Sequence, residues 1–466
     1  MFFLKPLSLC TDFTTHLNES LISIGGRPLS TKQRLWIALC ITGVLVTNSV
    51  CWKWFERASF GRFSSNTISK MFCRGKIFWD KLLLASVKRI FKAYGITSGV
   101  LALDGTENKR SKKTTRIAKV HKIKDKSSGG YVMGQQLTLL LLITDKVTVP
   151  VGFEFYEPDP QQKQWQTENK ALKKAGVPKS KRPKRPMRDS SYPTQTEVAL
   201  KILSRFKSDF PEIKVKAILA DAYYGSKTFF AQTSSIFEDA QMISQVKRTQ
   251  LVKSGGRYKS IENFFKGQLG VERLLSIRGE EKKVMIHGAR LYLKAHSCKR
   301  FIIAMKYEGE AEYRYLVASD LTWRLTDIAS AYTLRWLVEV FIQDWKSYEG
   351  WCQLAKQPGD YGTRRGVVLS LLTDHCLLLH EDQMALIERK LPAATVGSLR
   401  DRERANAMIE ALESLIQDAS DGQRIAAQLK DSIENTIPIR PSKKHMAHRE
   451  MPNLKSAPSL AYKKAA

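Results

Sequence analysis

The chain has 466 residues, with 76 Lys or Arg against 45 Asp or Glu and a formal net charge of +31. This excess of positive charge favours a polyanionic partner, nucleic acid above all, with an anionic membrane surface as the alternative. Because 43% of the residues are hydrophobic, the chain can bury large cores in roughly two to four domains, which excludes a wholly unfolded basic tail.

The seven cysteines point to a reducing environment. They contain no C-x-x-C pair and their number is odd, which argues against a structural zinc site and against a disulfide framework. No secretory signal with a small-residue cleavage site opens the chain. We therefore expect a cytoplasmic protein.

Residues 1–95 are predicted to form a helical domain, since helical patterns alternate there with short Gly, Ser and Asn breaks. The uncharged segment "LWIALCITGVLVTNSVCW", Leu35 to Trp52, contains polar residues that leave an apolar run of roughly twelve, short of the ~20 that a membrane span needs. We expect a buried core helix rather than a span. "SSNTISKMF", Ser64 to Phe72, predicts a short capped helix such as lies in a DNA groove, although capped helices are common.

From Val100 onward the pattern changes to strands. The segments "VLALD", "YVMGQQLTLLLLI" and "VTVPVGFEFY" predict buried or half-buried strands. The helix "TEVALKILSRF" and the strands "VKAILAD" and "AQMISQVKR" follow, an alternation typical of an α/β layer. Between them, "KKAGVPKSKRPKRPMR" (173–188) holds eight Lys or Arg among prolines. We expect a solvated loop there, with contact to phosphates as an open alternative.

The second half of the chain is predicted to be β-rich and then helical. Residues 253–322 contain three alternating segments, "KVMIHGARLYLKA", "RFIIAMKYEG" and "YRYLVASDL", which indicate a β insertion. A helix is expected from about Thr326 to Tyr348, and a helical C-terminal region at 351–435. Residues 436–466 are polar, basic and proline-containing, and we expect this C-terminal tail to be disordered.

The stretch "YTLRWLVEVFIQDWKSYEG", residues 332–350, predicts one amphipathic helix with an unusual charged stripe. At about 100° per residue, one side carries apolar residues, and Trp336 borders the stripe. A half-buried helix with a solvated charged face is the plain alternative. Four residues form the stripe: Tyr332, Arg335, Glu339 and Lys346.

Three carboxylates can belong to one site. Asp104 ends the apolar run "VLALD" and Asp221 ends "VKAILAD", and ligands of open α/β sheets gather beyond the carboxyl ends of strands. A turn-forming Asp is common after any strand and is the alternative for each. Together with Glu339 they would form a cluster of like charges, in which full ionisation is unfavourable unless cations bind. This predicts bound Mg²⁺ or Mn²⁺. Two such ions suit phosphoryl transfer.

These residues resemble a known family. The spacing of four residues is similar to the Y-R-E-K signature of insertion-sequence DDE transposases. Two residues separate Tyr332 from Arg335, three separate Arg335 from Glu339, and six separate Glu339 from Lys346. "LALDGT" and "LADAYYG" resemble the motifs that hold the first and second Asp of that family. The resemblance covers about residues 95–350.

The resemblance implies an α/β fold: a ribonuclease-H-like catalytic core with a β-strand insertion (96–350), flanked by the helical N-terminal domain and the C-terminal helices. It implies that Asp104, Asp221 and Glu339 are catalytic and bind two Mg²⁺ or Mn²⁺ ions. Arg335 and Lys346 would bind DNA phosphates, and Tyr332 would hydrogen-bond the same DNA backbone. Trp336 would stack on a displaced base.

The expected function is that of a transposase of a bacterial insertion sequence. It would bind the terminal inverted repeats of double-stranded DNA, hydrolyse a phosphodiester, and join the freed 3′-hydroxyl to target DNA. A nucleoid-associated homodimer is expected, with end recognition by 1–95 and subunit contact at 361–430. Two alternatives stay open: a non-catalytic DNA-binding repressor or inhibitor with the same fold, and a plain metal-dependent nuclease. A membrane-associated protein that uses residues 35–52 is a third.

Overall fold

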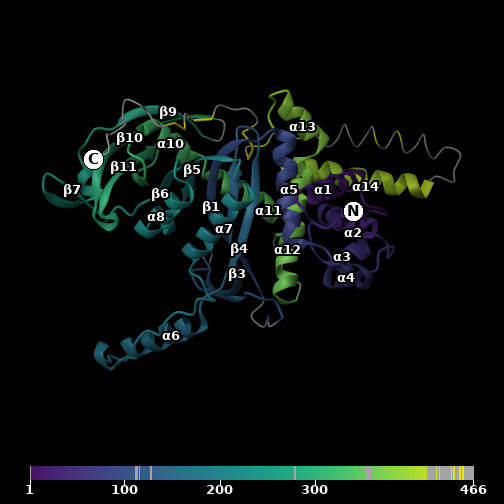
Figure 1. The fold of residues 1–466 in the computed structure, drawn as a ribbon, viewed down its shortest axis with the longest axis horizontal. Helices are drawn as coiled ribbons and strands as arrows, with labels where there is room; N and C mark the ends of the chain where they lie inside the picture. The colour runs from purple at the N-terminus through teal and green to yellow at the C-terminus, as the bar shows by residue number, and fades with distance from the viewer. Residues whose placement is uncertain are drawn as a thin grey trace.

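The chain folds into a mixed α/β structure, seen here in a computed structural model (Figure 1). Helices at the N-terminal end lie on one side of a large sheet, and the strands of the second half extend it on the other side. The structure describes residues 2–110, 114, 116–125, 128–277, 280–351, 358–416, 427, 430, 442, 444–446, 451–452 and 454–455.

The first ninety-odd residues are helical. The most apolar helix, α2, begins with a capping box in which Ser30 and Gln33 bond each other's backbone N–H groups, and it ends at Asn48 in the left-handed region (φ 53°). Its middle is buried on every side, which explains why its sequence shows no polar face. The helices are α1 Ser8–Ser23, α2 Thr31–Thr47, α3 Trp52–Ala58, α4 Ser65–Arg74 and α5 Trp79–Tyr94.

In the part of the chain that the structure describes, we find no single helix that is both long and apolar enough to cross a membrane. As a pair bent by 80°, α2 and α3 together meet the criteria of length and composition.

Five strands form the centre of the sheet, in the order β4-β3-β1-β5-β6. The strand β3 runs antiparallel to both of its neighbours, whereas β1, β5 and β6 run parallel to one another. This is the strand arrangement of a ribonuclease-H-like core, so the large mixed sheet is consistent with the predicted fold class. The strands are β1 Ser98–Lys109, β3 Tyr131–Ile143, β4 Thr148–Tyr156, β5 Lys214–Ala220 and β6 Gln241–Gln245.

The β-rich segment of the second half continues the same sheet. Strand β12 pairs with β6, and β11, β10, β7 and β8 follow outward, while β2 extends the other edge beside β3. The added strands are β2 His121–Lys124, β7 Leu251–Ser254, β8 Arg257–Ser260, β9 Val271–Ile277, β10 Glu280–Leu293, β11 Cys298–Tyr307 and β12 Arg314–Ala318. Short helices α9 Ile261–Phe265 and η3 Lys294–His296 lie among these strands.

Helices cover both faces of the central strands. Helices α5 and α7 contact β4 on one face, and α11 contacts β1 on the other. Figure 1 shows α6 extending away from the rest of the chain. The remaining helices are α6 Pro160–Lys174, η1 Lys179–Lys181, α7 Gln195–Asp209, η2 Ala222–Tyr224, α8 Lys227–Ile236, α10 Leu325–Thr333, α11 Trp336–Tyr348, α12 Gly359–Leu378, α13 Glu381–Glu388 and α14 Val396–Ile416.

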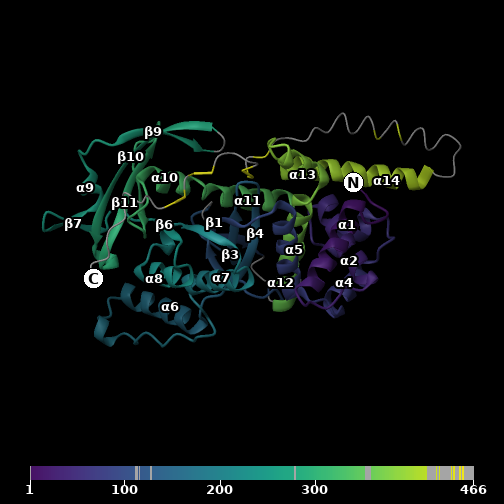
Figure 2. The same cartoon turned by 45° about the horizontal axis from the view of Figure 1, so that its top comes forward.

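The N-terminal helices share a hydrophobic core with the sheet and with the C-terminal helices. One continuous cluster of buried side chains includes Leu17 of α1, Ile41 of α2, Ala102 of β1 and Leu371 of α12. Figure 2 shows α1 and α2 beside α14, and α2 contacts α14 directly. The helical N-terminal region is therefore packed against the rest of the chain rather than separated from it by a linker.

Most of the C-terminal tail, 436–466, for which disorder is expected, lies outside the described residues, but residues 444–445 contact the rest of the chain. The Lys444 side chain is fully buried and its Nζ lies 2.8 Å from Oδ1 of Asp374 in α12. The backbone N–H of Thr148 donates to Nδ1 of His445 (2.9 Å), and the Thr148 hydroxyl donates to the Lys444 carbonyl (2.8 Å). These contacts place residues 444–445 beside the start of β4.

Candidate active site

The first candidate carboxylate, Asp104, lies within β1 and not at its end as predicted. Pairing of β1 with β5 stops at Ala102 opposite Leu219, but pairing with β3 continues through Asp104, opposite Leu139, as far as Lys109. One neighbour of β1 therefore ends while the other goes on. The gap left by β5 gives the Asp104 side chain room at the sheet edge, where its Oδ1 accepts a hydrogen bond from the Gly105 N–H (2.7 Å).

The second carboxylate, Asp221, follows β5 directly, as predicted. It caps the short helix η2, where its Oδ1 accepts a hydrogen bond from the Tyr223 N–H (2.9 Å). Its carbonyl accepts one from the Ser244 hydroxyl of β6 (2.6 Å). Asp104 and Asp221 each lie two residues beyond the last β1–β5 pair, so they stand at the same level of the sheet.

The signature segment is not one continuous α-helix, which corrects the expectation for 332–350. Helix α10 ends at Thr333 and α11 begins at Trp336. Between them the N–H groups of Leu334 and Arg335 bond the carbonyls three residues back, Ala331 and Tyr332, at 3.1 Å each. This tighter, 3₁₀-like step turns Arg335 toward the sheet edge.

Arg335 joins two of the three carboxylates. One guanidinium nitrogen lies 3.0 Å from Oδ2 of Asp104 and the other 2.6 Å from Oε1 of Glu339. The side chains of Asp104 and Arg335 are 20% and 17% exposed, whereas that of Glu339 is 54% exposed. The Asp104–Arg335 pair is therefore shielded from solvent, and Glu339 stands at the opening of the site.

The electrostatics place Asp221 in the same cluster. Burial raises the pKa of Asp104; Arg335 and the Gly105 N–H oppose this, while the charges of Asp221 and Glu339 add to it. Burial disfavours the charged form of Arg335, but Tyr332, Asp104 and Glu339 outweigh it and raise the pKa of Arg335. The site thus concentrates negative charge around one guanidinium.

The oxygen ligands suit a hard divalent ion, but the cation between them is Arg335. Among the residues that the structure describes, no group of three or more His, Cys, Asp or Glu side chains is gathered closely enough to hold a metal ion. Carboxylate oxygens are the ligands that Mg²⁺ and Mn²⁺ prefer. Asp104, Asp221 and Glu339 therefore fit such an ion in ligand chemistry, provided that the Arg335 guanidinium moves away from Asp104 and Glu339.

The other predicted site residues differ in accessibility. Tyr332 is buried, at 5% exposure, and burial raises its pKa to about 12, with Arg335 opposing and Asp221 adding to the shift. Trp336 is half-buried and packs against the hydrophobic core. Lys346 is half-buried near the end of α11. Tyr332 thus lies inside the carboxylate cluster, whereas Trp336 is packed in the way that a core residue would be.

Two tyrosines next to Asp221 belong to the site and were not singled out from the sequence. Tyr224 is buried, and burial raises its pKa, with smaller contributions from Asp221 and Asp104. Tyr223 is 54% exposed, and burial and Asp221 raise its pKa. Their position directly after a strand-terminal Asp was the available signal. Tyr223 offers an aromatic surface beside the carboxylates.

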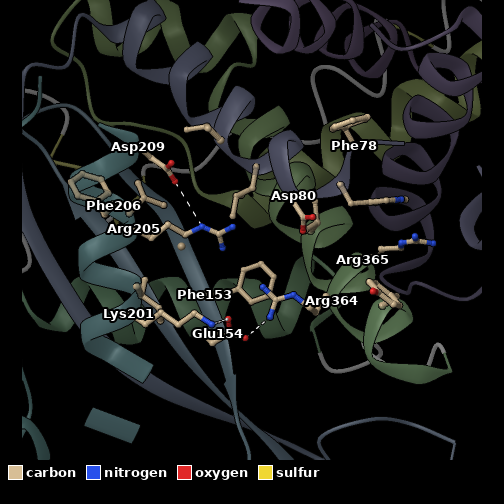
Figure 3. Close-up of a pocket in the computed structure, with 18 of the residues that line it drawn as sticks. Phe78, Asp80, Phe153, Glu154, Lys201, Arg205, Phe206, Asp209, Arg364 and Arg365 are labelled. Atoms are coloured by element: carbon tan, nitrogen blue, oxygen red, sulfur yellow. Dashed lines mark hydrogen bonds and ion pairs between the residues drawn. The ribbon is translucent and has the colours of Figure 1, made fainter. Parts of the chain in front are cut away.

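A cavity of about 790 Å³ lies elsewhere, between α5, β4, α7 and α12 (Figure 3). Its charged side chains neutralise one another: Arg364 pairs with Glu154, Lys201 lies 3.8 Å from Glu154, and Arg205 lies 3.9 Å from Asp209. None of the predicted site residues lines it. This cavity is therefore distinct from the carboxylate cluster.

The comparisons with known proteins bear on the carboxylate cluster. Residues 55–256 match the family model described as DDE superfamily endonuclease. The matched segment contains Asp104 and Asp221 and ends before Glu339. A comparison with curated proteins finds no match.

Two solved structures show distant similarity. The NurA nuclease from Sulfolobus solfataricus is 10% identical with a TM-score of 0.25, over 58% of this chain and 81% of that one. The Drosophila P element transposase, in its strand transfer complex, is 10% identical with a TM-score of 0.24, over 95% of this chain and 97% of that one.

Replacing Arg335 by glutamine is expected to raise the pKa of Asp104 further. Arg335 is the largest influence that favours the ionised carboxylate, while Asp221 and Glu339 would still oppose it. Because Asp104 is charged only above its pKa, the pH range in which it is ionised moves upward. NMR of ¹³C-carboxyl-labelled aspartate, with the signal assigned from Asp104→Asn, measures the shift. Arg364→Gln, which removes the pair with Glu154, is the control, and an equal shift there would contradict the assignment.

Proposed function

We propose that the chain is a DDE transposase of a bacterial insertion sequence. It binds the terminal inverted repeats of its element, cleaves one phosphodiester by metal-dependent hydrolysis, and joins the freed 3′-hydroxyl to target DNA. The observation that carries this proposal is the register of the sheet, which sets Asp104 level with Asp221, with Glu339 tied to Asp104 through Arg335. The match of residues 55–256 supports the endonuclease part.

The three carboxylates are the proposed ligands of two Mg²⁺ or Mn²⁺ ions. When bound, such ions activate the attacking water or hydroxyl and stabilise the leaving oxygen. The chain itself supplies the fixed frame: Asp104 is held by β3 pairing and Asp221 by its bond from Tyr223. Arg335 holds the place of a cation between Asp104 and Glu339 and is free to pair with a DNA phosphate once it leaves them.

The remaining contacts with DNA are assigned to the same face. Lys346 of α11 is proposed to bind phosphate, and Tyr332 and Trp336 to contact the backbone and a displaced base, as in the family that the sequence resembles. Because Tyr332 is buried, its contact requires that the cluster open when DNA binds. The N-terminal helices are proposed to recognise the element ends, and a homodimer to bridge two of them.

Purified full-length protein is expected to cut duplex DNA that carries the element's ends when Mg²⁺ or Mn²⁺ is added, and to stop when EDTA removes the ion. We expect this because clustered carboxylates repel a DNA phosphate, and a bound divalent ion is needed both to neutralise them and to activate the attacking water. Sequencing of the cut ends measures the position of cleavage and the 3′-hydroxyl. Joined products with a second duplex distinguish a transposase from a plain nuclease.

The matched control is the same assay on a duplex of equal length and unrelated sequence. Cleavage that is equal on both duplexes and yields no joined product would favour the plain nuclease. Tight binding without cleavage at any metal concentration would favour the repressor.

A further inference from the structure

The segment 160–188 forms an arm that the proposed catalytic centre does not use. It consists of α6, the 3₁₀ helix η1 and an extended return chain, and Figure 1 shows α6 extending away from the sheet. Among its residues, Gln162 alone is buried. Because the arm buries almost no apolar surface, it contributes little to the core, and another role must account for it.

The arm is held in one shape by polar contacts along its length. At the base, Asp159 caps α6 and its Oδ2 accepts a hydrogen bond from the Asp189 N–H (3.0 Å), which closes the two ends together. Farther out, Arg185 Nε donates to Gln162 Oε1 (2.6 Å) and Trp165 Nε1 donates to the Pro183 carbonyl (2.8 Å). The return chain is thereby fastened to the helix, so the arm is preorganised.

The arm carries a dense positive charge. Between residues 160 and 188 there are ten Lys or Arg and one acidic residue, Glu168, a net charge of +9. Among the described residues, Arg188 is the one arm cation with an ion-pair partner, Glu197 at 2.6 Å. Burial and the neighbouring charge of Lys122 lower the pKa of Lys163, so cations of the arm and of β2 crowd together. Such crowding favours an anion between them.

The arm leaves the sheet close to the carboxylates. Asp104 lies in the row Asp104–Leu139–Phe153, and the arm follows Tyr156, which lies three rows further along β4. At about 3.4 Å per residue along the strands and about 4.8 Å for each of the two strand spacings between β1 and β4, Tyr156 lies about 14 Å from Asp104. Burial raises the pKa of Tyr156, with Tyr223 adding to the shift and Arg188 opposing it, so the arm base lies near the residue that bonds Asp221.

We propose that the arm 160–188 binds the phosphate backbone of the same DNA duplex, next to the phosphodiester at the carboxylate cluster. This rests on the proposed function, since it takes that duplex as the partner. The 15 residues of α6 span about 22 Å at 1.5 Å per residue. With 3.4 Å per base pair, the arm covers about six base pairs of duplex outside the catalytic centre. Contacts to phosphates give affinity without sequence preference.

The test compares two full-length variants that lose the same charge. In the arm variant, five exposed lysines without ion-pair partners among the described residues become glutamine; the control does the same to five exposed lysines on the far strands and loops. The arm set is Lys173, Lys174, Lys179, Lys181 and Lys184, and the control set is Lys253, Lys259, Lys266, Lys294 and Lys299. Binding to a 40-base-pair duplex is measured in EDTA at several salt concentrations, so cleavage does not interfere.

The arm variant is expected to bind at least tenfold more weakly at about 0.1 M salt, with a log–log salt slope reduced by about 2.7 if three phosphate contacts are lost. The control variant should change far less. An equal loss in both variants, or no loss in the arm variant, overturns the proposal while leaving the function standing. Failure of the wild-type protein to bind any duplex overturns the proposed function itself.

A second variant replaces 160–188 by two glycines, which the closed base between Asp159 and Asp189 allows. Its hydroxyl-radical footprint should shorten by about six base pairs on one side of the cleavage point. An unchanged footprint contradicts the proposal. If the arm variant instead loses affinity for an RNA hairpin and keeps its affinity for duplex DNA, the partner is RNA and the proposal is wrong.

Discussion

Replacing Asp221 by asparagine is expected to lower the rate of metal-dependent DNA cleavage by about a thousandfold or more. The amide keeps the shape and the bond from the Tyr223 N–H but loses the negative charge that a divalent ion needs. A loss of about 4 kcal/mol in transition-state stabilisation corresponds to this factor. Asp104→Asn and Glu339→Gln should act in the same direction. Single-turnover cleavage of an end-labelled duplex in Mg²⁺ measures the rates.

Binding separates this effect from loss of structure. Affinity for duplex DNA should stay the same or rise slightly in all three variants, because a negative charge leaves a site that approaches phosphates. Asp239→Asn is the matched control, since Asp239 is exposed and precedes β6 at the opposite end of the sheet from Asp221. Cleavage near the wild-type rate by any one variant would remove that residue from the proposed catalytic set.

Replacing Lys444 by methionine is expected to lower the free energy of unfolding by about 3–5 kcal/mol, the usual cost of removing one partner from a buried ion pair. The Lys444 Nζ lies 2.8 Å from Asp374 and 5.2 Å from the centre of the Phe341 ring, in a site fully closed to solvent. Without the cation, the buried carboxylate of Asp374 loses its ion-pair partner, beside the buried carboxyl of Glu349. Urea unfolding followed by tryptophan fluorescence measures the loss.

The pH dependence gives a second measurement of the same contact. Burial and Asp374 raise the pKa of Glu349 far above its ordinary value, and Lys444 opposes this. A carboxyl with a raised pKa stabilises the fold at low pH, and the contribution is lost as pH rises through that pKa. Removing Lys444 raises the pKa of Glu349 further, so stability in the variant should keep falling with rising pH beyond the folded-state pKa at which the loss stops in the wild type.

The control for the tail is Lys455→Met, since Lys455 is exposed in the same segment. It should leave the unfolding curve unchanged at every pH. If Lys444→Met proves as harmless as Lys455→Met, the tail does not dock on α12 in solution.

Local sequence patterns were sufficient to predict the elements whose burial in the fold matches the periodicity of their own residues. Strands β3 and β5 and helix α7 have the periodicity that their burial requires, and each was predicted near its observed bounds. Asp221 was placed correctly because the whole of β5 stops there. The match of residues 55–256 to the DDE superfamily endonuclease model agrees with the expected resemblance to DDE enzymes, and the Y-R-E-K group within them stays a prediction.

What local patterns could not supply were features set by distant partners. The apolar run of β1 stops at Asp104, but the strand continues because β3 still pairs with it, and β3 lies about thirty residues later. The break before Trp336 contains neither Pro nor Gly, so nothing in the residues marks it. Lys444 is polar and lies in a basic tail, yet it is buried because Asp374, 70 residues away, neutralises it.

The site shows the same division. Composition and spacing selected Asp104, Asp221, Arg335 and Glu339, and the structure brings them near one another. The spacing could not reveal that Arg335 would lie between two carboxylates, because that depends on the tighter step after Tyr332 and on the early end of β5.

The residue at the end of α2 has a consequence for the far end of α11. Asn48 donates through Nδ2 to the Ser347 carbonyl (2.6 Å) and accepts through Oδ1 from the Gly350 N–H (3.0 Å). Both groups on the α11 side belong to the backbone, so the contact does not depend on the side chain of Ser347. It is sensitive to changes at Asn48 and at Gly350, whose positive φ of 82° disfavours any side chain. The C-terminal end of the helix that presents Glu339 is thus fixed to the N-terminal helices by two hydrogen bonds, so the orientation of that helix depends on a residue nearly three hundred positions earlier in the chain.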